Sequence, residues 1–306
     1  MATSSSMDRY IANIRGKVAI VTGAASGLGK QLSKVLAENQ LKVLLVDIDP
    51  KVEQVSNELN KQHHNTSSII LDLCERGSIQ KFFDKAIEKF GHIDIVVNNA
   101  GIANERSLFN QEDHKELDRI IDINLRAPME ATRLAVRYFR ETGIRGTVLN
   151  TASVGGLMPI SLMESYGSTK AGIIFFTASC KALAPQVRVN AVAPYFTDTP
   201  LVANSRLVQA YPLVQKIGLM KPEKVIKTMI KALGDESLAG DTLMIAMGAK
   251  AEKLTFYDGL TLQVTAYIAG GTVNKYAASI SSYFSGMLNS ILGFLRNPVP
   301  VDIKRE

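Results

Sequence analysis

Seven short apolar runs, rich in β-branched residues, alternate with amphipathic helical stretches, and this alternation restricts the fold more than any other feature. The runs are Val18–Val21, Val43–Asp47, Ile69–Leu73, Ile93–Asn98, Thr147–Thr151, Val187–Val192 and Thr242–Met247. Strands that are buried on both faces read as continuous apolar runs, and strands that alternate with helices form a parallel sheet. Because such crossovers are right-handed, the pattern predicts one doubly wound α/β domain. Its ligand is expected beyond the carboxyl ends of the strands.

The alternating pattern sets the expected boundaries. It occupies residues 15–250, preceded by an N-terminal extension over residues 1–14. A connecting segment is expected over residues 251–271, and a C-terminal tail over residues 272–306. Hydrophobic residues make up 46% of the chain and charged residues 21%, which is enough apolar material for a core and excludes a disordered protein.

Charge and cysteine usage exclude several classes of protein. The chain has 35 Lys and Arg against 29 Asp and Glu, a formal net charge of +6, without the basic stripe of a nucleic-acid-binding protein. Cys74 and Cys180 give neither a disulfide framework nor zinc-ligand spacing, and four histidines leave little material for a metal site. The first fifteen residues lack the apolar core of a secretory signal. We therefore expect a cytoplasmic protein without a metal or nucleic-acid partner.

A glycine-rich turn, Thr22–Gly29, follows the first run and precedes a helix. Gly23, Gly27 and Gly29 would let the backbone turn tightly, approach a pyrophosphate and pack the helix on the strand. The helix N-terminus supplies amide donors and the positive end of a dipole for phosphates. This turn, including Ser26 and Leu28, is predicted to bind a dinucleotide.

Asp47 ends the second run, at the place where a carboxylate can accept both hydroxyls of an adenosine ribose. The same charge would repel a 2′-phosphate. No Arg or Lys stands in the glycine-rich turn or directly after Asp47 to offset that repulsion. The predicted cofactor is therefore NAD rather than NADP.

Tyr166 and Lys170 lie one helical turn apart, so they share a helix face. A tyrosine hydroxyl with a pKa near 10 is a poor base at neutral pH, and a nearby ammonium group is expected to lower that pKa. Ser153 follows the fifth run, where its hydroxyl could hold a substrate oxygen. Asn124 lies within an apolar helical stretch, where its amide needs a specific partner.

These motifs together resemble the classical short-chain dehydrogenase/reductase family over roughly residues 15–248. The resemblance rests on Thr22–Gly29, Asn98–Gly101, Asn124, Ser153, Tyr166 with Lys170, and Pro194–Thr199, in the usual order. It implies a single Rossmann-like domain with a seven-stranded parallel sheet. It also implies a catalytic tetrad of Asn124, Ser153, Tyr166 and Lys170.

The resemblance also implies a role for each site residue. Tyr166 would exchange the hydroxyl proton, and Ser153 would orient the oxygen. Lys170 would hold the nicotinamide ribose, and Asn124 would keep a water for proton relay. The remaining implied cofactor contacts are Asp47 with Ile48, Asp72 and Leu73 beside the adenine, Asn99 near the ribose, and Thr197 and Thr199 over the nicotinamide.

Within the family, the chain is similar to the NAD-dependent 15-hydroxyprostaglandin dehydrogenase group around Asn99–Glu105 and Gly156–Pro159. It departs from that group in two places, with Met163 in place of a substrate-binding glutamine and Tyr195 in place of a glycine. Met158, Met163, Tyr195 and Phe196 would either line a lipophilic substrate pocket or pack in the core.

The sequence thus predicts NAD-dependent oxidation of a lipophilic secondary alcohol (fatty-acid-derived, prostaglandin-like or steroid-like) to a ketone, with Tyr166 as general base and Ser153, Met163 and Tyr195 at the substrate. A catalytically idle, NAD-binding interaction protein on the same fold is the alternative. A homodimer or homotetramer is implied by the family.

The C-terminal tail has its own pattern. Apolar residues recur every three or four positions between Val273 and Leu295, opposite small, almost uncharged residues, until Pro298 and Pro300 end the helical pattern. Exposure of such a broad apolar stripe to water is energetically unfavourable. The tail is therefore expected to dock on its own domain or a partner subunit, or to lie on a membrane or lipid-droplet surface.

Overall fold

The computed structural model describes residues 6–103, 106–110, 113–203, 205, 214, 218–246 and 252–254. The chain divides into two compact units, residues 1–254 and residues 255–306. Every described residue belongs to the first unit. The predicted tail helix over residues 272–306 lies outside the described residues, as does the predicted connecting segment beyond residue 254.

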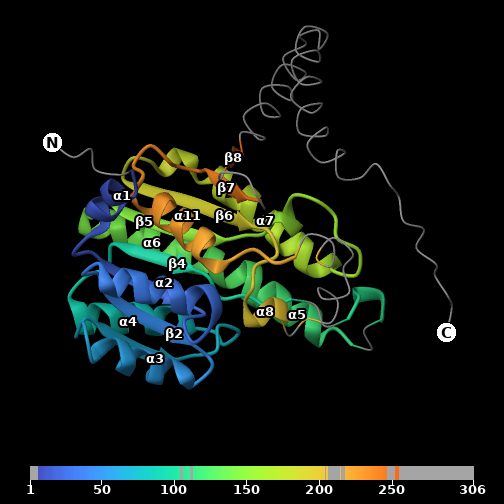
Figure 1. The fold of residues 1–306 in the computed structure, drawn as a ribbon, viewed down its shortest axis with the longest axis horizontal. Coiled ribbons are helices and arrows are strands. Elements are labelled where there is room, and N and C mark those ends of the chain that lie inside the picture. The colour runs from blue at the N-terminus through green and yellow to red at the C-terminus, as the bar shows by residue number, and fades with distance from the viewer. Residues whose placement is uncertain are drawn as a thin grey trace, which may run out of the picture. The chain divides into compact units, whose positions relative to one another are not determined.

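One sheet organises this first unit, with the strand order β3-β2-β1-β4-β5-β6-β7-β8 (Figure 1). Seven strands are parallel, which confirms the predicted fold class. They are β1 (Val18–Thr22), β2 (Lys42–Asp47), β3 (Thr66–Ile70), β4 (Ile95–Asn98), β5 (Gly146–Thr151), β6 (Val187–Pro194) and β7 (Thr242–Ile245).

An eighth strand, β8 (Glu252–Leu254), was not predicted and runs antiparallel to β7. Lys253 on this strand forms an ion pair with the buried Asp241, with 2.7 Å between Nζ and Oδ1. The stretch from residue 251 had been expected to be a connecting segment, and its first residues instead pair with the edge of the sheet.

The third strand begins earlier than its apolar pattern indicated. The prediction was Ile69–Leu73, whereas β3 pairs with β2 from Thr66↔Val43 to Ile70↔Asp47. Polar side chains hold the start of this strand against the helix before it, because Thr66 Oγ1 hydrogen-bonds the carbonyl of Ser56 and the side chain of Asn60. Leu71–Leu73 therefore lie beyond the strand end, in the wall of the cavity described below.

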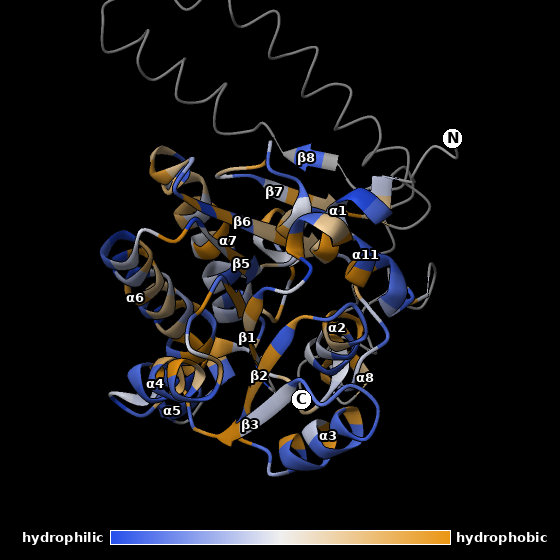
Figure 2. Cartoon of the chain, turned by 90° about the vertical axis from the view of Figure 1, so that its left-hand side faces the viewer, coloured by the Kyte–Doolittle hydropathy of each residue, from blue (hydrophilic) through white to orange (hydrophobic). Residues whose placement is uncertain are grey.

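Helices cover both faces of the sheet, and Figure 2 shows the hydrophobic strands between them. One core cluster contains side chains of α2 (Gly27–Glu38), α3 (Lys51–Asn60) and α11 (Pro222–Gly234). A second cluster contains side chains of α4 (Ser78–Phe90) and α6 (Ala127–Thr142). Helix α7 (Glu164–Ser179) packs beside α6 against β6.

The helix α1 (Ser6–Ile14), within the predicted N-terminal extension, packs against α11. A Cβ atom added to Gly234 would lie 2.2 Å from the Tyr10 carbonyl oxygen, so a glycine permits this close packing. No helix among the described residues is long and apolar enough to cross a bilayer.

The strand order reverses between β1 and β4, because β1 pairs with β2 on one side and with β4 on the other. Loops that leave the carboxyl ends of β1 and β4 turn to opposite faces of the sheet and leave a crevice there. The Gly-rich turn and the end of β4 both face this crevice, which therefore holds the candidate site.

Candidate active site

A cavity of about 310 Å³ lies at the carboxyl ends of the strands. Except for Gly29 and Asn124, all the site residues expected from the sequence line it. They are Gly23, Ser26, Gly27, Leu28, Asp47, Ile48, Asp72, Leu73, Asn99, Ser153, Met163, Tyr166, Lys170, Tyr195, Thr197 and Thr199.

Close backbone approach shapes the Gly-rich turn. Gly23 has φ +68°, and a Cβ added to it would lie 2.8 Å from the Ala100 Cα. A Cβ on Gly29 would lie only 2.1 Å from the Gly23 carbonyl oxygen. Ser26 is the N-cap of α2 and makes no side-chain capping bond. The turn is thus a cradle beside a helix N-terminus, which fits a pyrophosphate group.

Asp47 ends β2 beside this cradle. Its carboxylate accepts hydrogen bonds from the Ala25 amide at 2.9 Å and from the Asp49 amide at 3.0 Å. Asp47 therefore fixes the turn as well as carrying a negative charge into the cavity. The next residue, Ile48, is 50% exposed and forms an apolar wall there.

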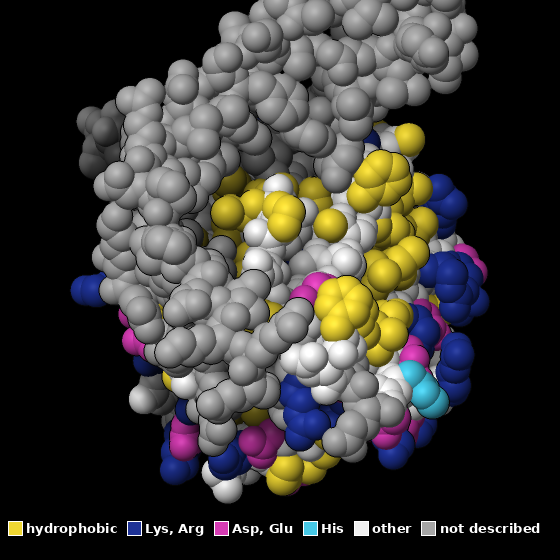
Figure 3. Space-filling model, turned by 90° about the vertical axis from the view of Figure 1, so that its right-hand side faces the viewer, with side chains coloured by type: hydrophobic (Ala, Val, Ile, Leu, Met, Phe, Trp, Pro, Cys, Tyr) yellow, Lys and Arg dark blue, Asp and Glu magenta, His cyan; other side chains and the backbone are white. Residues whose placement is uncertain are grey.

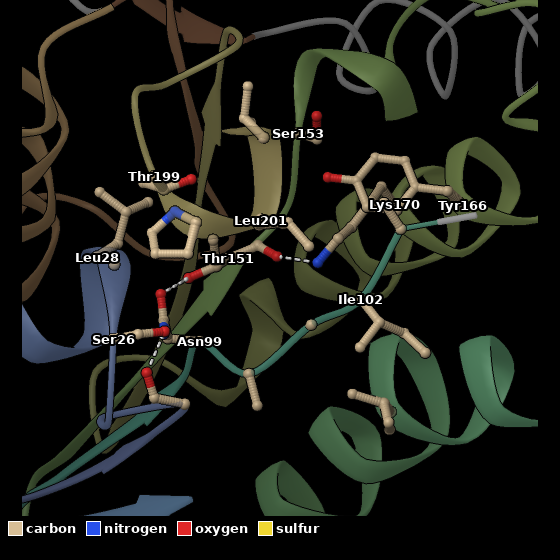
Figure 4. A pocket seen from close by; sticks show the side chains of 18 of the residues that line it. Ser26, Leu28, Asn99, Ile102, Thr151, Ser153, Tyr166, Lys170, Thr199 and Leu201 are labelled. Atoms are coloured by element: carbon tan, nitrogen blue, oxygen red, sulfur yellow. Dashed lines mark hydrogen bonds between the residues drawn. The ribbon is translucent and has the colours of Figure 1, made fainter. Parts of the chain in front are cut away.

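A chain of hydrogen bonds connects the turn to Lys170. The Asn99 side-chain amide donates to the carbonyls of Thr22 at 3.0 Å and Gly23 at 3.3 Å. The Thr151 hydroxyl donates to Asn99 Oδ1 at 3.4 Å, and Lys170 Nζ donates to the Thr151 carbonyl at 2.7 Å (Figure 4). Asn99 thus joins the ends of β1, β4 and β5, a structural role that its predicted position near the ribose did not include.

The hydroxyl groups of Tyr166 and Ser153 point toward each other at the cavity wall (Figure 4). Burial raises the pKa of Tyr166, and a hydrogen bond with the Ser153 side chain opposes that rise. Lys170 Nζ lies 5.7 Å from the Tyr166 ring centroid, which is within cation–π range. The expectation that Lys170 lowers the pKa of Tyr166 below its usual value is wrong for the protein alone, because desolvation of the phenolate dominates.

Burial acts on Lys170 as well. The side chain is 4% exposed, and desolvation lowers its pKa to about 8. A buried ammonium group loses hydration that one hydrogen bond to Thr151 does not replace. Near neutral pH, Lys170 is therefore close to the point at which it can release a proton.

Asn124 lies in a π-helical turn, η2 (Asp122–Arg126), between α5 (Lys115–Ile121) and α6. Its side chain accepts from the Ile102 amide at 2.9 Å and donates to the Ile102 carbonyl at 2.8 Å. It also donates to the Thr169 hydroxyl at 3.3 Å. Asn124 is fully buried behind the cavity wall. The sequence indicated that the Asn124 amide needs a specific partner, and that partner is the backbone of Ile102.

Apolar side chains form the end of the cavity beyond Tyr166. Met163 is 4% exposed and clusters with Ile160 and Val202. Tyr195 and Phe196 also line the cavity, with their rings 5.1 Å apart in an edge-to-face arrangement. Met163 therefore both packs in a core cluster and lines the cavity, whereas Met158 is not among the lining residues.

The sequence did not predict two contacts that hold loops beside the cavity, one made by Arg126 and one by Glu164. Arg126 donates to the carbonyls of Leu73 at 3.2 Å and Cys74 at 3.1 Å, which holds the wall predicted to flank an adenine. Its spacing from Asp122 is the usual signal of a helical ion pair and gave no hint of this contact. Glu164 binds Ser107 and Leu108, on a loop that no local pattern connects to it.

Comparison with protein families gives a match to the short chain dehydrogenase model over residues 17–209. The 3-oxoacyl-(acyl-carrier-protein) reductase of Thermotoga maritima is 31% identical over 233 residues, which cover 73% of this chain and 93% of the relative. The NAD(+)-dependent 15-hydroxyprostaglandin dehydrogenase of Mus musculus is 29% identical, over 76% of this chain and 91% of the relative.

Solved structures show the same similarity. The 3-ketoacyl-(acyl-carrier-protein) reductase of Brucella melitensis, in complex with NADH, aligns with a TM-score of 0.70 at 29% identity. The alignment covers 77% of this chain and 98% of that protein.

Proposed function

The chain belongs to the short-chain dehydrogenase family of oxidoreductases, which act on CH–OH groups, and we propose that it oxidises a lipophilic secondary alcohol to a ketone with NAD. The observation that carries the proposal is the convergence of Ser153, Tyr166 and Lys170 on one cavity whose other end is the glycine cradle. Proton-exchanging groups and a dinucleotide cradle are what such an oxidation requires.

The cofactor would lie along the cavity from Asp47 to Lys170. Gly23 and Gly29 would let the turn and the start of α2 pack tightly enough for the backbone to approach a pyrophosphate, since a Cβ at either glycine would collide with Ala100 or with the Gly23 carbonyl. Asp47 would accept the hydroxyls of the adenosine ribose, and its charge supports NAD over NADP. When bound, NAD supplies the acceptor for the hydride that leaves the alcohol carbon.

The residues of the chain would move and hold the proton. Tyr166 would take the proton of the alcohol hydroxyl, and the Ser153 hydroxyl would hold the same oxygen. Because burial raises the pKa of Tyr166, the phenolate needs a cation beside it. Lys170 is the candidate, and its lowered pKa would let it pass the proton on. Asn124 would hold the Ile102 backbone, and thus the part of the cavity wall that Ile102 forms, in place.

Substrate class is proposed from the apolar end of the cavity. Met163, Tyr195 and Phe196 surround the space beyond Tyr166 and offer dispersion contacts to a hydrocarbon chain or ring. The relative from mouse acts on a hydroxyprostaglandin by its name, which is consistent with a lipophilic alcohol here.

The test is a set of secondary alcohols, from 2-propanol to 2-decanol, assayed by NADH absorbance with NAD and with NADP. We expect turnover with NAD that improves with apolar chain length. Tight NAD binding without turnover of any alcohol would favour the catalytically idle interaction protein instead. A clear preference for NADP would contradict the role of Asp47.

Assembly as a homodimer or homotetramer is part of the proposal. The apolar residues of α7 are not confined to one face, because Ile173 and Ile174 are buried while Phe175 beside them faces outward, which is typical of a helix covered on more than one side. Phe175 on α7 and Met129 on α6 are exposed in the single chain, at 60% and 40%. Analytical ultracentrifugation would show the oligomeric state in solution.

A cytoplasmic location, with contact to a lipid surface through residues 272–306, is likewise proposed from the sequence alone.

A further inference from the structure

Glu164 begins α7 two residues before Tyr166 and has no part in the proposed chemistry. Its carboxylate accepts a hydrogen bond from the Ser107 hydroxyl at 3.0 Å and one from the Leu108 amide at 3.2 Å. Burial opposes ionisation of Glu164, but the polar groups of its own backbone, Leu108, Ser107 and Leu162 outweigh that effect and lower the pKa of its carboxyl. One carboxylate thus joins two loops that are far apart in the sequence.

The first of these loops contains an unusual backbone conformation. Leu162 has φ +68°, in the left-handed region that a branched, non-glycine residue rarely adopts. Such a conformation persists only where the surroundings hold it. The Leu162 side chain is 48% exposed, so burial of that side chain does not hold the turn. The hydrogen bond from the Met163 amide to the Ile160 carbonyl, at 3.2 Å, closes this turn, and Glu164 follows it directly in the chain.

The strained turn determines where Met163 lies. Immediately after Leu162, the chain reverses and inserts Met163 into the apolar end of the cavity, where it is 4% exposed. The second loop follows the opposite wall, formed by Ile102 and Ala103. Ala103, which precedes the second loop, packs against the cluster that contains Met163, and Glu164 ties that loop to the start of α7. Hydrophobic side chains gather on this side of the molecule, where α5, α7 and α8 (Pro200–Ala203) lie (Figure 3).

We propose that Glu164 is a positioning residue that fixes the width of the substrate end of the cavity by holding Met163 and the Ser107–Leu108 loop in place. It thereby sets affinity for long apolar alcohols and takes no part in proton transfer. This inference rests on the proposed alcohol dehydrogenase function.

The charge of Glu164 is essential to this role. A carboxylate only accepts hydrogen bonds, and Ser107 and the Leu108 amide both donate to it. Glu164→Gln keeps the shape of the side chain but removes its charge and one acceptor oxygen, so the side chain can no longer accept from both Ser107 and Leu108. The matched control is Glu88→Gln on α4, where the carboxylate is 71% exposed and pairs only with Lys85 among the described residues.

The kinetic test compares 2-decanol, which would reach Met163, with 2-propanol, which would contact only the region of Tyr166. In the full-length protein, Glu164→Gln should raise the KM for 2-decanol about tenfold, because charge-assisted hydrogen bonds are lost. The kcat/KM for 2-propanol and the Kd for NAD should stay within about twofold of wild type. Equal losses with both alcohols would mean a general loss of structure, and no change with either would overturn the proposal.

A second readout does not need activity. Hydrogen exchange at the Leu108 amide, which donates to Glu164, should accelerate in Glu164→Gln and remain at the wild-type rate in Glu88→Gln. If Glu164→Gln unfolds, Ser107→Ala removes one donor and should give a smaller change in the same direction. If the wild-type protein oxidises neither alcohol, the proposed function fails, while unchanged exchange at Leu108 would refute the positioning role itself.

Discussion

Gly29→Ala is the sharpest test of the cofactor cradle, because the structure fixes how little room is available. The new Cβ would lie 2.1 Å from the Gly23 carbonyl oxygen and 2.6 Å from Asn99 Nδ2. Ordinary van der Waals contact for such an atom begins at 3.4 Å. The N-terminus of α2 would therefore have to retreat by 3.4 − 2.1 = 1.3 Å from the end of β1.

Two effects of this substitution oppose each other. Alanine favours a helix over glycine by about 1 kcal/mol. Overpacking against atoms that cannot move costs about 1–3 kcal/mol, and here the nearest atom belongs to the backbone of Gly23. We expect a net loss of up to about 2 kcal/mol in the free energy of unfolding. We also expect NAD affinity to fall by at least about tenfold, because a displaced helix start misaligns its amides.

Denaturant unfolding and calorimetric titration with NAD would measure both effects. The control is Ser33→Ala in the same helix, because the buried Ser33 hydroxyl has no hydrogen-bond partner within the described part of the chain. Removing it should leave stability unchanged or slightly higher and NAD affinity unchanged. Wild-type affinity for NAD in Gly29→Ala would refute the assignment of this turn as the pyrophosphate cradle.

Three further predictions follow from the site. Asp47→Asn, which keeps one acceptor for the Ala25 amide, should raise the ratio of NADP to NAD efficiency by about tenfold or more, as measured by steady-state kinetics; an unchanged ratio would contradict the ribose role. Tyr166→Phe should lower kcat by roughly a thousandfold at unchanged NAD affinity, and substantial residual turnover would remove Tyr166 from the mechanism. Burial lowers the pKa of Lys170 from 10.5 to about 8, so the unfolded chain binds the extra proton above pH 8 and stability should rise with pH. Between pH 8 and about 9.5, the unfolding free energy of wild type should gain up to about 2 kcal/mol relative to Lys170→Met, and parallel pH profiles would refute the buried charge.

Local backbone geometry explains why several residues that line the cavity could be found from the sequence. Gly23 and Asp47 lie at the carboxyl ends of adjacent parallel strands, where chain position alone brings residues together. Tyr166 and Lys170 share one helical turn, so their proximity also follows from spacing. Such residues can be found without knowing any tertiary contact.

Other features depend on contacts between distant segments, which no local pattern reports. β3 begins at Thr66, whose hydroxyl bonds to the helix before it, three residues ahead of the apolar run that starts at Ile69. The π-helical turn around Asn124 accompanies a side-chain bond to Ile102, and the direction of the pKa shift of Tyr166 depends on burial that only the fold creates.

The hydrogen bonds from the Gly-rich turn through Asn99 and Thr151 to Lys170 also have a thermodynamic consequence. The side chains of Asn99, Thr151 and Lys170 are already fixed by these hydrogen bonds. Binding of a cofactor therefore has little conformational entropy to remove from them. The rigidity of the site belongs to the free protein. The heat-capacity change on NAD binding should therefore match that expected from the apolar surface covered by the cofactor, without the larger negative value that accompanies folding of a loose site.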